Sequence, residues 1–183
     1  MVTLSGRQSP PRGEPMLKTL TSPTEGAVGE QEFRSALRLF ASGVTVITTP
    51  DGAGGVHAMT ATAFSSLSLR PPLVLVAVAR DSRCHRLIAE GRRFGISILY
   101  DHQTAVARHF GKQGLAEPPP AFAMLDGVPV IEGAMANLAC ALEEPVEGGD
   151  HSIFVGLVTA AEARPGSPLL HFDGRYRTLH DLS

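Results

Sequence analysis

The segment MTATAFSSLSLRPP, residues 59–72, decides how this sequence is interpreted. It combines hydroxyl side chains, small side chains and one aromatic ring, carries no charge before Arg70, and stops at two prolines. Its composition suits an ordinary edge strand, because β-branched and aromatic residues favour extended backbone. The same residues can also bring backbone amides and short hydroxyls close to a flat, polar ligand. Both interpretations predict one strand that starts near Val56 and runs through the segment.

The composition is that of one globular domain. A chain of 183 residues can bury a substantial core, and its net charge is only -2. Lys and Arg are scattered, so no nucleic-acid partner is indicated. No apolar run approaches the roughly 20 residues that span a bilayer, so no membrane segment is expected. Cys84 and Cys140 have neither disulfide-framework nor metal-ligand spacing, which predicts no metal site and a reducing, cytoplasmic setting.

The first 28 residues differ from the rest of the chain. They are rich in Ser, Thr, Gly and Pro and show no apolar periodicity and no signal-peptide core. We expect residues 1–28 to form a disordered leader and residues 29–183 to form the folded domain.

Periodicity and turn signals predict a mainly β fold with two or three short helices. Phe33, Leu37 and Phe40 share one face of a helix that starts near Glu30, and Ser82 is a suitable N-cap for a helix through Ala89. A third helix is expected over residues 103–110, with a stop at 111–114 and a loop at 117–120. About seven strands are expected: six over residues 44–49, 56 onward, 73–79, 94–99, 133–142 and 151–163, and then short closing strands that residues 169–172 and 176–179 could form. Because the strands follow one another through turns, the pattern favours an antiparallel barrel.

Acid–base or nucleophilic machinery is not evident in the sequence. The seven histidines are dispersed, without a metalloprotease motif or a nucleophile elbow. Cys84 lies near a predicted helix start, where a thiolate could be stabilised, but packing is the favoured role for it and for Cys140. A protein that binds a cofactor, which then carries the chemistry, fits this sequence better.

Several motifs in order resemble the short-chain flavin reductases, the reductase components of two-component flavin-dependent monooxygenases. The main matches are F-R-x-A-L at 33–37, F-A-x-G-V-T-V-I-T-T at 40–49 and M-T-A-x-A-F-x-S-x-S-L-x-P-P-L-V at 59–74. Shorter matches follow at residues 94–99, 110–111, 127–129, 149–151 and 174–176. The resemblance spans roughly residues 30–179.

This resemblance implies an antiparallel split β-barrel, a homodimer, and reduction of FMN or FAD by NADH or NADPH, with the reduced flavin passed to a partner monooxygenase. It implies that one segment wraps the flavin, that a helix start also touches it, and that a histidine lies beside the nicotinamide. The implied flavin residues are Thr60, Ala61, Thr62, Ala63, Phe64, Ser66, Leu67, Ser82 and Arg83, and the implied catalytic residue is His151.

Elementary chemistry agrees with those roles. Thr60 and Thr62 could serve the pyrimidine edge of the flavin, and a helix N-terminus with Arg83 suits a phosphate. Thr62 stands where Asn or Ser is common in the family, which leaves the choice between FMN and FAD open. Two other interpretations remain: a flavin-binding electron carrier of the same fold, and a ligand-binding barrel without catalysis.

Overall fold

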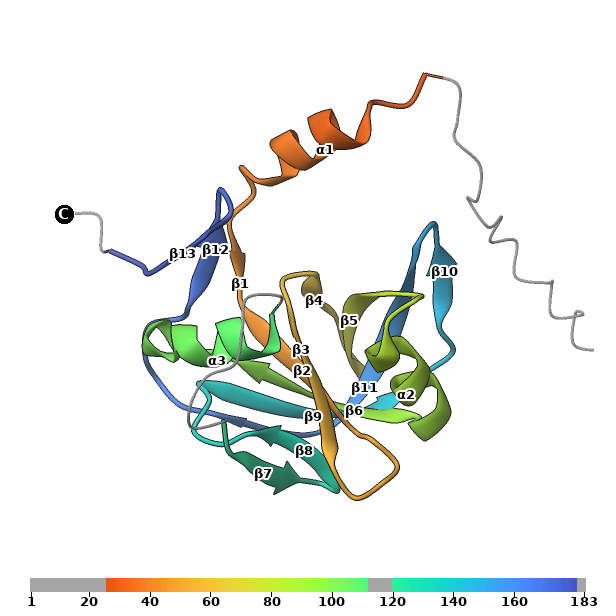
Figure 1. The fold of residues 1–183 in the computed structure, drawn as a ribbon. Helices are drawn as coiled ribbons and strands as arrows, with labels where there is room; N and C mark the ends of the chain where they lie inside the picture. The colour runs from red at the N-terminus through yellow and green to blue at the C-terminus, as the bar shows by residue number, and fades with distance from the viewer. Residues whose placement is uncertain (1–25, 112–119, 181–183) are drawn as a thin grey trace, which may run out of the picture.

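A single curled antiparallel sheet forms the body of the protein (Figure 1). The structure is a computed structural model and describes residues 26–111 and 120–180. Seven strands follow the order β3-β2-β6-β9-β11-β5-β4, and β10 extends the sheet beside β11. Their bounds are β2 Thr45–Pro50, β3 Val56–Ala61, β4 Phe64–Leu69, β5 Pro72–Ala79, β6 Arg93–Ile98, β9 Ala136–Leu142, β10 Val146–Gly148 and β11 His151–Ala163. The predicted antiparallel, mainly β fold is confirmed.

The expectation of one strand through residues 59–69 is wrong. β3 and β4 follow each other in the chain but lie at opposite ends of the strand order. β3 pairs with β2, with Ala61 opposite Thr45, whereas β4 pairs with β5, with Phe64 opposite Val76. Only Thr62 and Ala63 connect them, so the sheet must curl until its two edges are two residues apart. This connection, here called the corner, spans the split in the barrel.

Short elements complete the fold. Three small strands form a second sheet in the order β1-β12-β13, and β7 and β8 form a separate hairpin. The bounds of the remaining elements are β1 Ser42–Gly43, β7 Phe122–Leu125, β8 Val128–Ile131, β12 Leu170–Phe172, β13 Arg175–Arg177, α1 Glu30–Leu37, α2 Arg83–Gly91, α3 Thr104–Phe110 and the 3₁₀ turn η1 Asp101–Gln103.

The prediction of about seven strands is too low, since the described residues contain thirteen. Four of the additional strands, β1, β7, β8 and β10, have two to four residues, too few for periodicity to reveal them. The six-residue β4 is additional because the single strand expected over residues 59–69 is divided. Helix α1 ends at Leu37, so Phe40 lies beyond the helix on whose face it was expected. Residues 1–25 of the expected leader, and most of the expected helix stop and loop at 111–120, lie outside the described residues.

Two apolar clusters lie against the curled sheet and are closed by different helices. One cluster contains Ile47, Val76 and Phe154, and α2 adds Cys84 and Ile88 to it. The other contains Val46 and Leu99, and α3 adds Ala107. Cys84 and Cys140 are buried core residues, as predicted, and burial raises the pKa of each thiol to about 12. Neither cysteine is therefore a thiolate at neutral pH.

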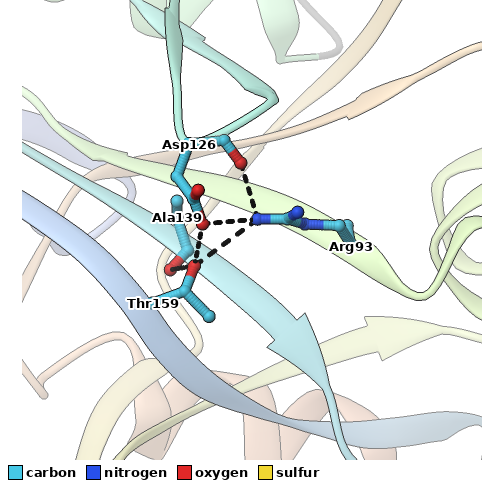
Figure 2. Close-up of polar contacts among 4 residues, drawn as sticks. All are labelled: Arg93, Asp126, Ala139 and Thr159. Carbon is cyan, nitrogen blue, oxygen red and sulfur yellow. Dashed lines mark hydrogen bonds and ion pairs between the residues drawn. The ribbon is translucent and has the colours of Figure 1, made fainter.

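A polar cluster holds the β7–β8 hairpin onto the sheet (Figure 2). Arg93 Nη2 donates to the Asp126 carbonyl at 2.6 Å and to its carboxylate at 2.7 Å. Thr159 Oγ1 donates to the same carboxylate oxygen at 2.6 Å. Thr159 falls where the β9–β11 register shifts, so this irregularity aims its hydroxyl at the hairpin. The Thr159 hydrogen bond, with that of Arg93, lowers the pKa of Asp126.

Gly156 on β11 lies where the sheet leaves no room for a side chain. A Cβ there would lie 2.7 Å from Phe94 Cζ and 2.9 Å from Cys140 Cβ. Phe94 is fully buried, so its ring cannot move outward without disturbing the core.

Gly156→Ala should therefore destabilise the fold by overpacking, by about 1–3 kcal/mol. Gly43→Ala is the matched control, because a Cβ at Gly43 meets nothing within 4 Å. The measurement is the urea midpoint of unfolding. Equal midpoints for the two variants would contradict this account of the core.

Candidate functional site

The predicted site residues of the corner and of the α2 start, together with His151, gather around the carboxyl end of β5. On one side of this strand, the Ala77 amide donates to the Ala63 carbonyl at 3.0 Å, which brings the corner alongside. On the other side, His151 pairs with Ala79 in the β5–β11 register. The chain then leaves β5 and reaches Ser82 and the start of α2. Three segments distant in sequence therefore meet at one end of one strand.

The corner is exposed and built from small residues. Thr62 and Ala63 are both exposed, whereas Ala61 before them is buried. Thr45 Oγ1 donates to the Ala61 carbonyl at 2.8 Å, which fixes the backbone as it enters the corner. The Thr62 hydroxyl has no hydrogen bond within the described part of the chain. Its donor and its acceptors are therefore open to a ligand.

Thr60 is used differently from its neighbour. Its hydroxyl donates to the Ala107 carbonyl at 2.7 Å and so holds α3 against β3. A donor already used inside the protein is not available to a flavin, although its lone pairs are. Thr62 is thus the better hydroxyl donor of the segment, a distinction that sequence order alone does not provide.

The residues of β4 spread away from this point. Phe64 packs on the inner core opposite Val76, so its ring supports the corner from below. Ser66 pairs with Val74, and Leu67 lies in the adjoining register shift and is half-exposed. Val74 lies five positions before the end of β5, about 17 Å along the strand. Ser66 and Leu67 are therefore not brought together with His151.

The start of α2 is shaped to leave two amides free. Ser82 is the N-cap, as predicted: its hydroxyl accepts from the His85 amide at 3.1 Å and donates to the Ala79 carbonyl at 2.7 Å. The amides of Arg83 and Cys84 have no acceptor among the described residues. Free amides at a helix start carry partial positive charge and attract anions.

Arg83 adds a full charge at that position. Its side chain is exposed and forms no ion pair within the described residues. Its charge reaches the β2–β3 hairpin. The pKa of Asp51 is lowered chiefly by the amides of Ala53 and Gly55 and further by Arg83, and that of His57 is lowered by burial and then by Arg83. The guanidinium thus lies near enough to the β2–β3 hairpin to act on these groups, and without an ion pair among the described residues it could pair with a phosphate.

His151 is held by its neighbour in the chain. Its Nδ1 lies 2.8 Å from the Asp150 carboxylate, and this hydrogen bond lowers the pKa of Asp150. A proton kept on Nδ1 leaves Nε2 as an acceptor in the neutral ring. The side chain is 45% exposed, so the ring is accessible from solvent.

The structure adds one residue that sequence reasoning missed. His85 Nε2 lies 2.8 Å from Ser152 Oγ, and its ring packs on Phe154 with centroids 4.9 Å apart. This contact joins the first turn of α2 to the residue after His151. Burial lowers the pKa of His85, so its ring is neutral at pH 7. No local spacing could reveal a pair separated by 67 positions.

The site offers binding groups rather than acid–base machinery. Among residues 26–111 and 120–180, no cluster of His, Cys, Asp or Glu could hold a metal ion. The exposed corner, the free amides, one guanidinium and one oriented imidazole suit a flat ligand with a phosphate. None of the helices in the described ranges has the length and apolar character needed to cross a bilayer.

Comparison with known proteins identifies the class. The model of the flavin reductase like domain matches residues 37–180, and the chain belongs to this family. The NADH-dependent flavin reductase StyB of Pseudomonas fluorescens is 39% identical over 148 residues, 79% of this chain and 86% of the relative. The reductase component of 4-hydroxyphenylacetate 3-monooxygenase from Thermus thermophilus is 40% identical over 151 residues, 82% of this chain and 97% of the relative.

Solved structures agree with this assignment. The styrene monooxygenase flavin reductase from Pseudomonas putida superposes with a TM-score of 0.77 at 38% identity, covering 82% of this chain and 99% of that one. Other curated relatives are named as NADH-dependent FMN and FAD reductases. The family and the split-barrel fold expected from the sequence are thereby confirmed.

Proposed function

We propose that this protein is an NAD(P)H-dependent flavin reductase that supplies reduced FMN or FAD to a partner monooxygenase. The observation that carries the proposal is the meeting of the corner, the α2 start and His151 at the end of β5. Relatives named as NADH-dependent flavin reductases and as a monooxygenase reductase component support it. Two free, buried cysteines fit a reducing, cytoplasmic setting.

The residues of this chain bind the flavin and align its ring with the nicotinamide. The Thr62 hydroxyl and the corner amides suit the polar edge of the isoalloxazine, while the amides of Arg83 and Cys84 and the Arg83 guanidinium suit the phosphate. The bound flavin supplies a ring that accepts hydride from the nicotinamide. The protein contributes alignment of the two rings, and no side chain needs to transfer a proton in that step.

His151 suits the second substrate. Its Nε2 can accept a hydrogen bond from the carboxamide of a nicotinamide, while Asp150 keeps the ring oriented. His85 and Ser152 fix the strand beside it to the same helix start that suits the phosphate. The two binding regions therefore share one rigid support.

The exposure of the site to solvent favours a flavin that exchanges with solution over a flavin that stays bound, as in an electron carrier. Thr62 and Ala63 are both exposed, so a ligand against them would keep one side open to water. Release of reduced flavin to another protein requires such an open site.

We also propose a homodimer, because two apolar surfaces lack partners in the described part of one copy. Helix α1 stands away from the sheet (Figure 1), and Phe33 and Leu37 are each 54% exposed. The outer face of β5 and β11 presents half-buried apolar residues opposite the buried Val74, Val76 and Val78. These are Leu73, Leu75, Ile153, Val155 and Leu157. Burial of both surfaces between two copies would remove them from water.

Leu37→Glu should shift the protein toward monomers, because it places a charge on the apolar face of α1. Sedimentation should give the parent a mass near twice 19.3 kDa and the variant a mass nearer 19.3 kDa. Met124→Glu is the control, as Met124 is 67% exposed on β7 and belongs to neither apolar surface. A monomeric parent would contradict the proposed dimer.

Arg83→Ala should weaken binding of FMN more than binding of riboflavin, because only FMN carries a phosphate. Loss of a charge-assisted hydrogen bond costs about 1.5–3 kcal/mol, roughly ten- to a hundred-fold in affinity. Quenching of flavin fluorescence measures both ligands. Arg86→Ala, at an exposed position of the same helix, should change neither. If Arg83→Ala lowers the affinity for FMN and for riboflavin equally, Arg83 does not bind the phosphate.

His151→Ala should raise the NADH concentration needed for half-maximal flavin reduction and slow the reduction, while flavin affinity stays nearly unchanged. Stopped-flow reduction of FMN at saturating flavin, titrated with NADH, tests both this residue and the proposed function. His102→Ala, an exposed histidine on η1, serves as control. Absence of FMN reduction by the parent protein would contradict the proposed reductase function. If the variant shows the same NADH dependence as the parent, His151 has no part in binding NADH, and the proposed reductase function still stands.

A further inference from the structure

The start of α2 and the β10–β11 turn are joined by three contacts. The Arg80 amide donates to the Asp150 carbonyl at 3.0 Å, and the Arg80 guanidinium lies 3.4 Å from the Glu147 carboxylate. The third contact is the pair described above, His85 Nε2 and Ser152 Oγ at 2.8 Å. Arg80 precedes the helix, so among these three contacts only that of His85 is made by α2 itself.

The His85–Ser152 contact lies in the interior, whereas the ion pair lies at the surface. Arg80 and Glu147 are both exposed, so their ion pair contributes little to holding the helix. Ser152 is buried, and the His85 ring packs on the fully buried Phe154. A buried hydroxyl that loses its partner is not compensated by water, so the interior contact holds the two elements together more firmly than the exposed pair.

His85 holds the helix start through both its backbone and its side chain. Its amide donates to the Ser82 hydroxyl at 3.1 Å and completes the cap, while its imidazole reaches β11. Arg83 and Cys84, whose amides are free, lie between Ser82 and His85 in the chain. The contact therefore fixes the position, relative to β11, of the amides that suit the flavin phosphate.

Ser152 connects this position to His151. The two residues are adjacent in β11, where they pair with Val78 and Ala79, and successive side chains of a strand point to opposite faces. Ser152 accordingly points into the core, where it is buried, while the His151 side chain is 45% exposed. A shift of Ser152 relative to His85 would therefore also shift the backbone that carries His151.

We propose that His85 is a positioning residue for flavin reduction, which sets the separation between the α2 start and His151 by binding Ser152. Its Nε2 is bound to the hydroxyl, so it acts through Ser152 rather than on a ligand. Hydride passes directly between two rings that must be in contact, and a displacement of about 1 Å can slow such a step about a hundred-fold. The proposal rests on the proposed function, because it concerns the alignment of the two substrates of that reaction.

Two substitutions of His85 separate the hydrogen bond from the shape of the side chain. His85→Leu keeps apolar packing on Phe154 but cannot bind the Ser152 hydroxyl, whereas His85→Gln offers a donor and an acceptor that can bind it. We expect the limiting rate of FMN reduction, at saturating FMN and NADH, to fall about ten-fold or more in His85→Leu and to recover largely in His85→Gln. Anaerobic stopped-flow absorbance measures this rate. Arg86→Ala, at an exposed position of α2, should keep the parental rate.

Two further readouts distinguish alignment from a loss of binding or folding. The affinity for FMN, measured by fluorescence quenching, should stay near the parental value, because the corner, the helix amides and Arg83 are retained. The long-wavelength absorbance of a nicotinamide ring stacked on the flavin should weaken in His85→Leu and return in His85→Gln. A parental limiting rate in His85→Leu, an equally slow His85→Gln, or a rate lost only together with FMN affinity would each overturn the proposal.

Ser152→Ala tests the contact from its other side and changes less of the core. If His85 acts through Ser152, this variant should lose the limiting rate to a similar extent, and the double variant His85→Leu, Ser152→Ala should be no slower than the slower single variant. Losses that multiply in the double variant, or a parental rate in Ser152→Ala, would overturn the proposal. Absence of FMN reduction by the parent would instead contradict the proposed function, so the two failures are distinct.

Discussion

The connection of two sheet edges by Thr62 and Ala63 is the constraint on which the rest of this structure depends. Two residues span only a few ångströms, so β3 and β4 can be consecutive only if the sheet between them curls. The curl encloses one apolar cluster, which α2 closes, and leaves a second cluster outside, which α3 closes. An exposed turn of small residues is thereby fixed between paired strands, an arrangement that suits a binding surface.

The same constraint explains the division of tasks among the hydroxyls. Thr45 and Thr60 donate to backbone carbonyls and hold the strand and helix around the corner, whereas Thr62 is open to a ligand. The Ser82 hydroxyl caps α2 by accepting from the His85 amide, and the amides of Arg83 and Cys84 remain without an acceptor among the described residues. The polar side chains next to the corner are thus mostly used for positioning, and under the proposed function the flavin would meet backbone amides, one hydroxyl and one guanidinium.

Sequence reasoning succeeded where the signal was local. The β-branched run of β2, the Ser82 cap and the buried cysteines follow from neighbouring residues, and ordered motifs identified the family. It failed where a strand ended without a turn signal, since the corner contains neither Gly nor Pro. The β7–β8 hairpin did carry such a signal in Asp126-Gly127, both with positive φ, at 42° and 77°. The His85–Ser152 contact depends on tertiary structure alone and had no sequence signature.

The central claim is that the protein reduces flavin as an exchanging substrate, and anaerobic NADH oxidation with excess free FMN tests it most directly. The account predicts many equivalents of NADH oxidised per protein chain, continuing until the FMN in solution is consumed. Oxidation that stops after one equivalent per bound flavin would indicate an electron carrier, and no oxidation would indicate a binding barrel; either result would contradict the account.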